Sequence, residues 1–175
     1  MDHIATLSNE DLKDLGNQGF TLALRLLSHR EDAADAVQDA MHQLFRKHAS
    51  FDSGRGSLKS WFLRIVKNRC MDMRRKAQPV SAGSDFDPLD RSSGLPQDNL
   101  VKKEGVDIVR DALNQLSEES REILLLRDFH GLRYAEIADV LGISPGTVMS
   151  RLHRSREKLR EQISHTGGRD KHVQL

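Results

Sequence analysis

The sequence predicts an all-α protein made of two small helical domains joined by a flexible linker. Aromatic residues make up only 5% of the 175 residues and charged residues 30%, a composition that favours helices over sheets. Apolar residues recur at steps of three and four, the spacing of one helix face, on both sides of a central stretch. That stretch contains three of the four prolines, Pro79, Pro88 and Pro96, and it divides the helical pattern in two.

The proline-containing stretch also holds several serines and glycines. It cannot bury enough apolar area to offset the entropy of ordering it. We therefore expect a helical domain at residues 1–77, a linker at 78–103, a second helical domain at 104–163 and a disordered tail at 164–175. Both helical segments exceed about 50 residues, which is enough for a small domain.

Charge, cysteine content and hydropathy restrict the classes of function. A net charge of +1 is too weak to coat nucleic acid unless the charge is locally segregated. The single Cys70 cannot form an internal disulfide, and no apolar run approaches the ~20 residues of a membrane span. The acidic residues Asp2, Glu10 and Asp11 do not resemble a signal peptide. We expect a cytoplasmic protein that is not inserted in a membrane.

The sequence lacks the common motifs of catalysis. It contains no glycine-rich phosphate loop, no H-E-x-x-H and no paired-cysteine spacing for zinc. The eight histidines are scattered, and His42 and His48 are six residues apart, which is a poor fit to one helix face. We expect no catalytic residue, no metal and no cofactor.

The N-terminal segment predicts a helix with a short apolar face (Phe20, Leu24, Leu27), followed by a second helix that the Ser28-x-x-Glu31 spacing starts with a capping box. The predicted core face of the second helix comprises Ala34, Val37, Met41, Leu44 and Phe45. Its acidic and amide face comprises Asp35, Gln38, Asp39 and His42. This polar face fits a solubilising surface and a docking surface for a basic partner equally well.

A loop with two glycines, residues 50–56, precedes a third helix predicted at 57–76. Its predicted core stripe comprises Leu58, Phe62, Ile65, Val66, Arg69, Cys70 and Met73. Its predicted outer stripe comprises Ser60, Arg64, Lys67, Asn68, Met71, Arg74 and Arg75. Trp61 beside these basic residues suits single-stranded nucleic acid, whose bases stack on aromatic rings. Taken alone, Trp61 fits a core position better.

The C-terminal segment predicts four helices. Apolar periodicity from Val106 to Leu116 indicates the first, and the second is capped by Ser117 and ended by Gly131. The third and fourth are predicted at 134–141 and 145–163. Together they make a second all-α unit.

The last two predicted helices have the A-x3-G-x5-V spacing of a helix-turn-helix, formed by Ala138, Gly142 and Val148. The alanine is small where two helices cross, the glycine supplies the turn conformation, and the valine packs between the helices. Ser144 followed by Pro145 is typical of an N-cap and a first helical position. The fourth helix therefore begins at the proline.

This fourth helix is basic, with five basic side chains and one acidic side chain between Arg151 and Arg160. Ser150, Arg151, Arg154 and Lys158 share one face at helical spacing. Such a face suits the major groove, where Arg binds guanine edges and Ser or Lys reaches phosphate. A solvated charged helix, or an αα-hairpin that contacts protein, is the alternative. The helix-turn-helix spacing favours DNA.

The motifs of both domains resemble one family. Residues 17–77, with the strings REDAADAVQD, FDSGRGSLKSWF and KNRCMDMRR, resemble region 2 of the extracytoplasmic-function (ECF, group 4) sigma factors of the sigma-70 family. Residues 106–163 resemble region 4 of the same family. The resemblance implies an alternative sigma factor, which binds core RNA polymerase and directs promoter-specific transcription initiation without catalysis of its own.

The family pattern implies functional residues in each region. Its D-x-x-Q-[DE] stretch docks on a coiled coil of the largest catalytic subunit, which implies polymerase contacts for Asp35, Gln38, Asp39 and the neighbouring His42. Melting of the −10 element and capture of a flipped base are implied for Phe51, Asp52, Arg55, Ser57, Trp61, Arg64, Lys67, Asn68, Asp72 and Arg75. Recognition of the −35 element is implied for Ser144, Thr147, Ser150, Arg151, Arg154, Arg156 and Lys158. The polymerase flap and an anti-sigma factor are further implied partners.

Two positions depart from the family pattern. Met149 stands where many relatives carry Lys or Arg, which implies a lost contact and a shifted promoter preference. Arg133 replaces the usual Ser or Thr cap before Tyr134, which implies a helix weaker by ~1 kcal/mol unless another group compensates. The rival hypothesis is a helix-turn-helix repressor or activator that acts without polymerase. Such a protein has no use for the segment 51–75.

Overall fold

The computed structural model describes residues 7–77 and 108–169, and every regular element in these ranges is helical. The chain divides into two compact units, which are described separately. The N-terminal unit contains α1 (Asn9–Leu27), α2 (Arg30–Arg46), the 3-10 helix η1 (His48–Ser50) and α3 (Leu58–Ala77). The C-terminal unit contains a helix at 108–114, α5 (Glu118–Leu124), the π-helix η2 (Leu125–Phe129), α6 (Tyr134–Leu141) and α7 (Pro145–Arg169). The all-α prediction is confirmed, whereas the predicted linker at 78–103 lies outside the described residues.

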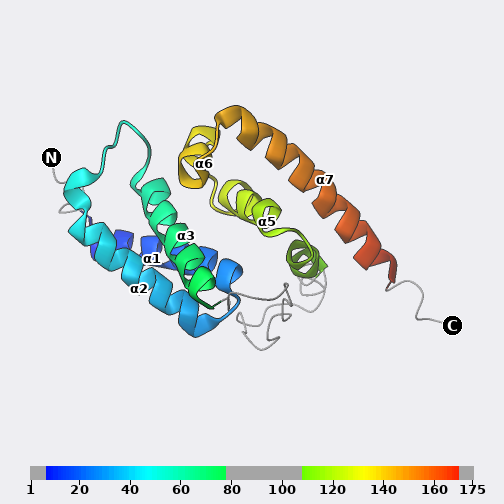
Figure 1. The fold of residues 1–175 in the computed structure, drawn as a ribbon, viewed down its shortest axis with the longest axis horizontal. Coiled ribbons are helices and arrows are strands. Elements are labelled where there is room, and N and C mark those ends of the chain that lie inside the picture. The colour runs from blue at the N-terminus through cyan, green and yellow to red at the C-terminus, as the bar shows by residue number, and fades with distance from the viewer. Residues whose placement is uncertain (1–6, 78–107, 170–175) are drawn as a thin grey trace. The chain divides into compact units, whose positions relative to one another are not determined.

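In the N-terminal unit, α1, α2 and α3 each pack against the other two (Figure 1). A capping box that apolar periodicity does not reveal starts α1. The Asp11 backbone N–H donates to Ser8 Oγ (3.1 Å), and the Ser8 backbone N–H donates to Asp11 Oδ2 (3.0 Å). The hydrogen bonds from Ser8 hold the pKa of the Asp11 carboxyl below its ordinary value.

The buried face of α1 is made of other residues than the predicted apolar face. The buried side comprises Leu15, Gly19, Leu22, Ala23 and Leu26. Phe20, Leu24 and Leu27 lie at its edge and are partly exposed. Phe20 has a separate role, because the Arg30 guanidinium of α2 lies over its ring, 5.5 Å from the centroid.

The predicted capping box at Ser28 is also wrong. Ser28 adopts a left-handed conformation (φ 65°) and ends α1, with its N–H donating to Leu24 O at 3.0 Å. His29 precedes α2 without a side-chain capping hydrogen bond. Since only two residues separate α1 from α2, the chain reverses at Ser28 itself. A residue in the left-handed region cannot also hold the extended conformation that an N-cap requires.

The core face of α2 differs from the predicted one. Its buried residues are Ala33, Ala36, Ala40 and Leu44. Of the predicted face, only Leu44 is buried; Ala34 is exposed, Val37 and Met41 are intermediate, and Phe45 is 47% exposed. The reason is steric: α2 packs against both α1 and α3, and a ridge of alanines lets helix axes approach closely.

Most of the predicted core stripe of α3 is confirmed. Phe62, Ile65, Val66 and Cys70 are buried, whereas Leu58, Arg69 and Met73 are partly exposed. Leu63 is buried as well, and Ser60, predicted on the outer face, is only 3% exposed. Ser60 tolerates burial because its hydroxyl donates to Ser57 O (2.8 Å), while Ser57 Oγ caps the helix by accepting from Ser60 N–H (3.2 Å).

Two glycines of the N-terminal unit differ in how closely they are packed. At Gly19 of α1, a Cβ atom would lie 2.7 Å from the Phe62 ring, so a side chain there would displace an aromatic of the core. At Gly16 the nearest neighbour would be the flexible end of Met41, at 3.3 Å. The contact between α1 and α3 therefore depends on the missing side chain of Gly19.

In the C-terminal unit, Ile123, Leu126 and Leu132 are buried together with residues of α6 and α7. Arg121 of α5 is 8% exposed, and its guanidinium donates to three backbone carbonyls. The acceptors are Leu113 O (3.0 Å), Asn114 O (2.7 Å) and Leu116 O (3.2 Å). Leu113 and Asn114 end the preceding helix and Leu116 lies in the turn that follows it, where carbonyls lack the N–H four residues on that a continuing helix would supply. Arg121 thus fixes the helix at 108–114 to α5.

The end of α7 is a further correction. The sequence predicted an end near Ile163 and a disordered tail from residue 164, but the helix continues to Arg169. The Ser164 hydroxyl donates to Arg160 O (2.9 Å) one turn back. Gly167 and Gly168 belong to this last part of the helix, since a glycine costs a helix only about 1 kcal/mol and does not force its end. Residues 170–175 lie outside the described residues.

Candidate nucleic-acid interface and docking face

The helix-turn-helix geometry is confirmed. Ala138 is 7% exposed and Val148 is fully buried, as expected for the alanine and the valine of this spacing. Gly142 has φ 68°, a left-handed conformation that glycine adopts without a side-chain clash. At the start of α7, Ser144 Oγ accepts from Thr147 N–H at 3.1 Å. The turn and the cap fix the direction in which α7 leaves α6.

Helix α6 is capped even though Arg133 stands in the place of a Ser or Thr cap. The Glu136 carboxylate accepts from the Arg133 backbone N–H (2.9 Å) and from its Nε (3.3 Å). Glu136 is only 6% exposed, which strengthens these charge-assisted bonds. The third residue of the helix therefore supplies the capping interaction that the missing Ser or Thr does not.

The exposed side of α7 carries the predicted contacts Ser150, Arg154 and Lys158. Arg151 is partly buried, and its Nη1 lies 3.5 Å from Glu119 of α5. A polar pocket between α5 and α7 is lined by Ser117, Glu119, Ser120, Arg151, Arg154, Ser155 and Lys158. The structure thus brings three predicted cations to one concave surface. Glu119, which orients one of them, was missed by the sequence because it belongs to another helix.

Arg156 lies apart from these cations. Its guanidinium binds Asp128 of η2, with Nη2 at 2.5 Å from Oδ1 and Nε at 3.3 Å from Oδ2. The hydrogen bond that Arg156 donates to the Asp128 carboxylate raises the pKa of Arg156 above its ordinary value. In this structure the residue ties α7 to η2, and its contact with DNA stays a prediction.

In the N-terminal unit, Trp61 of α3 faces Phe51 of the preceding loop. The ring centroids are 5.5 Å apart and the planes are inclined by 43°. Trp61 is neither fully buried nor fully exposed, so part of its ring is available to a ligand. The loop itself is folded by Asp52, whose Oδ1 accepts from Gly54 N–H (2.9 Å) and whose carbonyl accepts from Arg55 N–H (3.1 Å).

A groove runs from η1 along α3 and collects four of the predicted residues. It is lined by Gln43, Lys47, Ser50, Trp61, Arg64, Ile65, Asn68, Arg69 and Asp72. Asp72 also binds the predicted Arg75. Lys67 and the loop residues Asp52, Arg55 and Ser57 do not line this groove. Lys47 and Ser50 were missed, since they follow the end of α2 and belong to no periodic face.

The acidic face of α2 is exposed as predicted, with Asp35, Gln38, Asp39 and His42 all accessible. Asp39 Oδ2 lies 2.7 Å from Arg69 Nη2 of α3. A second groove beside this face is lined by Asp39, His42, Gln43, Phe45, Arg46, Arg69 and Asp72. Phe45, which the sequence placed in the core, is therefore an apolar member of an otherwise polar surface.

Neither a membrane-spanning helix nor a cluster of metal-binding residues is found among the described residues. No helix of residues 7–77 or 108–169 is long and apolar enough to cross a bilayer. The same ranges contain no group of three or more His, Cys, Asp or Glu placed to hold a metal ion.

Two family profiles match this chain and correspond to its two units. Sigma-70 region 2 matches residues 13–80, and Sigma-70 region 4 matches residues 107–159. Together they cover more than half of the chain. The chain belongs to the ECF sigma-70 family. Regions 2 and 4 of the sigma factor are the units built on α1 to α3 and on α5 to α7.

Curated relatives support the assignment. The sigma factor is 30% identical over 160 residues to the ECF RNA polymerase sigma factor SigE of Mycolicibacterium smegmatis, covering 89% of this chain and 61% of that protein. It is 29% identical over 154 residues to the ECF RNA polymerase sigma factor SigW of Bacillus subtilis, covering 82% of each. The ECF RNA polymerase sigma factor SigM of Mycobacterium tuberculosis is 37% identical over 131 residues, 74% of this chain and 63% of SigM. The chain thus spans less than two thirds of SigE and SigM.

Two solved structures resemble the chain. The sigma factor RpoE of Bartonella quintana, crystallised with the anti-sigma factor NepR, matches with a TM-score of 0.67 and 26% identity over 89% of this chain and 95% of RpoE. CnrH, in complex with the cytosolic domain of CnrY, matches with a TM-score of 0.64 and 23% identity over 89% of this chain and 86% of CnrH. At that identity the likeness to CnrH shows a shared fold.

Proposed function

We propose that this chain is an alternative sigma factor that binds core RNA polymerase in the cytoplasm and directs promoter-specific transcription initiation, without catalysing a reaction itself. The observation that carries the proposal is the match to regions 2 and 4 in one chain, in family order. Each match falls on a folded helical unit with its own charged face.

Region 4 binds the −35 element through α7. The helix-turn-helix geometry supports this role, since the second helix of such a pair enters the major groove with its first turns on the base edges. Ser150, Arg154 and Lys158 project from its exposed side, and Glu119 holds Arg151 beside them. Ser144, Thr147 and Arg156 complete the proposed contact surface. Arg and Lys pair with guanine edges and Ser with any of several base edges, and Lys also binds phosphate as a point charge.

Region 2 opens the −10 element through α3 and the loop before it. The tilted Phe51 and Trp61 rings offer an aromatic platform for an unstacked base. Arg64 and Asn68 line the adjacent groove and supply a cation and an amide for backbone and base edge. The proposed interface further comprises Asp52, Arg55, Ser57, Lys67, Asp72 and Arg75. Stacking and hydrogen bonds at this interface offset the few kcal/mol of free energy that extruding a base requires.

The exposed acidic face of α2 docks on core polymerase. Asp35, Gln38, Asp39 and His42 would meet the coiled coil of the largest catalytic subunit, and region 4 would contact the flap. Complementary charge steers such association and sets its register. An anti-sigma factor is a further proposed partner, because the similar sigma factor RpoE is bound to one.

Run-off transcription with purified core polymerase, with and without this chain, on a promoter library tests the proposal. We expect transcripts that depend on the chain and that start downstream of a shared pair of DNA elements. The chain should also comigrate with core polymerase on a sizing column.

Absence of both results contradicts the proposal. If the chain instead binds duplex DNA tightly and specifically without polymerase and gives no transcripts, the repressor or activator hypothesis replaces it.

A further inference from the structure

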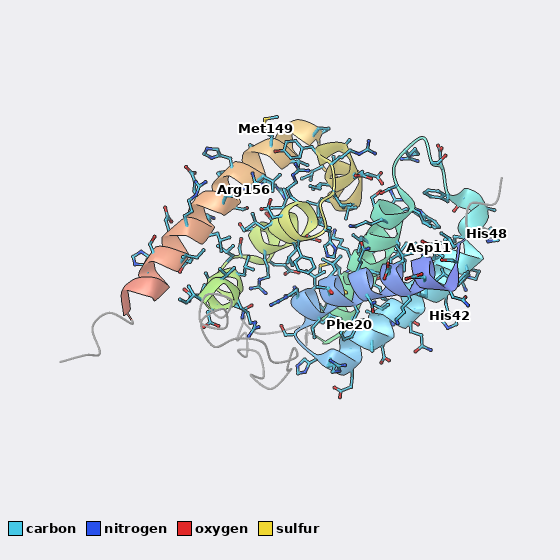
Figure 2. The ribbon with its side chains drawn as sticks, turned by 180° about the vertical axis from the view of Figure 1, so that it is seen from behind. Asp11, Phe20, His42, His48, Met149 and Arg156 are labelled. Atoms are coloured by element: carbon cyan, nitrogen blue, oxygen red, sulfur yellow. The ribbon has the colours of Figure 1, made fainter. Side chains whose placement is uncertain are left out.

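Met149, in the first turns of α7, is 60% exposed although it is a large apolar side chain. Figure 2 shows it near the start of the helix, with its sulfur directed away from the ribbon. The neighbouring Val148 and Leu152 are buried and account for the packing of α7. Met149 therefore contributes little to the core of the unit.

The position of Met149 on the helix places it at the proposed base-reading surface. Successive helical residues are about 100° apart, so Met149 and Arg151 flank Ser150 on its two sides. Ser150 points away from the buried residues Val148 and Leu152. A groove that receives Ser150 at its centre therefore receives Met149 along one wall and Arg151 along the other.

The chemistry of Met149 suits one group of the major groove. A thioether chain has no charge and no strong donor, so it gains little from a phosphate or from the polar base edges. The apolar group that a base pair presents in the major groove is the 5-methyl of thymine. An unbranched side chain with three rotatable bonds can adapt to a methyl group whose position depends on local DNA geometry.

We infer that Met149 is a specificity-determining residue that selects a thymine in the −35 element by packing against its 5-methyl group. This inference rests on the proposed function, because it assumes that α7 reads that element. It goes further by naming the residue, the base and the atom group. A lysine or arginine at the same position would seek a phosphate or a guanine instead, so the methionine changes which sequence is preferred.

The test removes the methyl group from the DNA and the side chain from the protein. Holoenzyme is assembled from core polymerase and the full chain, and each thymine of the −35 element, on both strands, is replaced singly by uracil. At one position we expect roughly fourfold weaker binding, the value of one buried methyl group. With Met149→Ala, thymine and uracil at that position should bind equally. Met149→Leu should keep part of the difference.

Two controls separate the inference from the proposed function. Arg154→Ala should weaken recognition of the whole element and keep the methyl-sensitive position. His153→Ala, an exposed neighbour on the same helix, should keep both.

If no position shows a methyl effect that depends on Met149 while Arg154→Ala still weakens element recognition, the inference is wrong and the proposed function stands. If the holoenzyme shows no dependence on the element, or the chain directs no transcription, both are wrong.

Discussion

Helices α2 and α7 present opposite charges to solvent, and they are packed in different ways. α2 buries a ridge of alanines, whereas α7 buries Val148 and Leu152. In both cases a neighbouring element supplies a counter-charge to the exposed face. Arg69 of α3 binds Asp39 at 2.7 Å, and Glu119 of α5 lies 3.5 Å from Arg151.

The comparison shows that, in each unit, a side chain from a neighbouring helix of the same unit pairs with the charged face. An ion pair of this kind, partly exposed, adds little to stability, on the order of 0 to 1 kcal/mol. Its effect is to limit the directions that a long side chain samples. We therefore expect the acidic face to serve a basic protein partner and the basic face to serve DNA, with separable effects of mutation.

The largest expected effect is on polymerase binding. Asp35→Ala combined with Asp39→Ala removes two charged contacts, each worth about 1.5 to 3 kcal/mol, so core association should weaken by roughly a hundredfold or more. Competition binding to core polymerase measures this change, and circular dichroism checks the fold. Glu10→Ala combined with Asp14→Ala removes two exposed carboxylates from α1 and is the matched control. Equal losses in both double variants would mean that only overall charge matters.

The second prediction concerns the opposite face. Arg154→Ala should weaken recognition of the upstream element by about tenfold to a hundredfold, corresponding to about 1 to 3 kcal/mol, and leave core binding unchanged. Run-off transcription from promoters with intact or scrambled upstream elements measures it. Arg160→Ala removes one exposed cation six residues later on α7 and should have a smaller effect. A parallel loss of core binding in Arg154→Ala would contradict the separation of the two faces.

The third prediction addresses the packing of α2. Ala36→Leu inserts a large side chain into the alanine ridge and should lower the free energy of unfolding by about 1 to 3 kcal/mol. Ala34→Leu, on the exposed side of the same helix, should change it by less than about 0.5 kcal/mol. Urea unfolding followed by the fluorescence of Trp61, the only tryptophan of the chain, reports on this unit. Similar losses in both variants would show that the ridge is not tightly packed.

The smallest expected effect is a pH dependence at the start of α1. The pKa of Asp11 is lowered in the folded protein by its hydrogen bonds with Ser8. The stability that it adds is therefore present above the ordinary value of 3.8 and is lost as the pH falls through the lowered pKa. In Asp11→Asn, the Tm between pH 5 and pH 3 should fall less steeply. Asp14→Asn is the control, and an identical acid profile for Asp11→Asn and the parent chain would disprove the contribution.

Local chemistry explains why the sequence predicted the C-terminal unit better than the N-terminal one. The turn at Gly142 and the cap at Ser144 involve residues within four positions of each other, and both are confirmed. In α2 the prediction of the buried face followed the large apolar residues. It therefore placed Phe45 and Val37 in the core instead of Ala36, which is the buried residue. Alanine contributes little to a pattern of hydrophobic residues, although its small side chain allows the closest approach of two helices.

The sequence by itself determined the helical class, the helix-turn-helix and the family motifs, because these depend on composition, spacing and residues near one another in the chain. Only the tertiary structure decided which side of α2 is buried, and which partners Arg151 and Arg156 take. The physical reason is that each of those outcomes depends on a contact between elements. The strength of such a contact depends on the distance between two helix backbones. The hydrophobic pattern of one helix does not determine that distance.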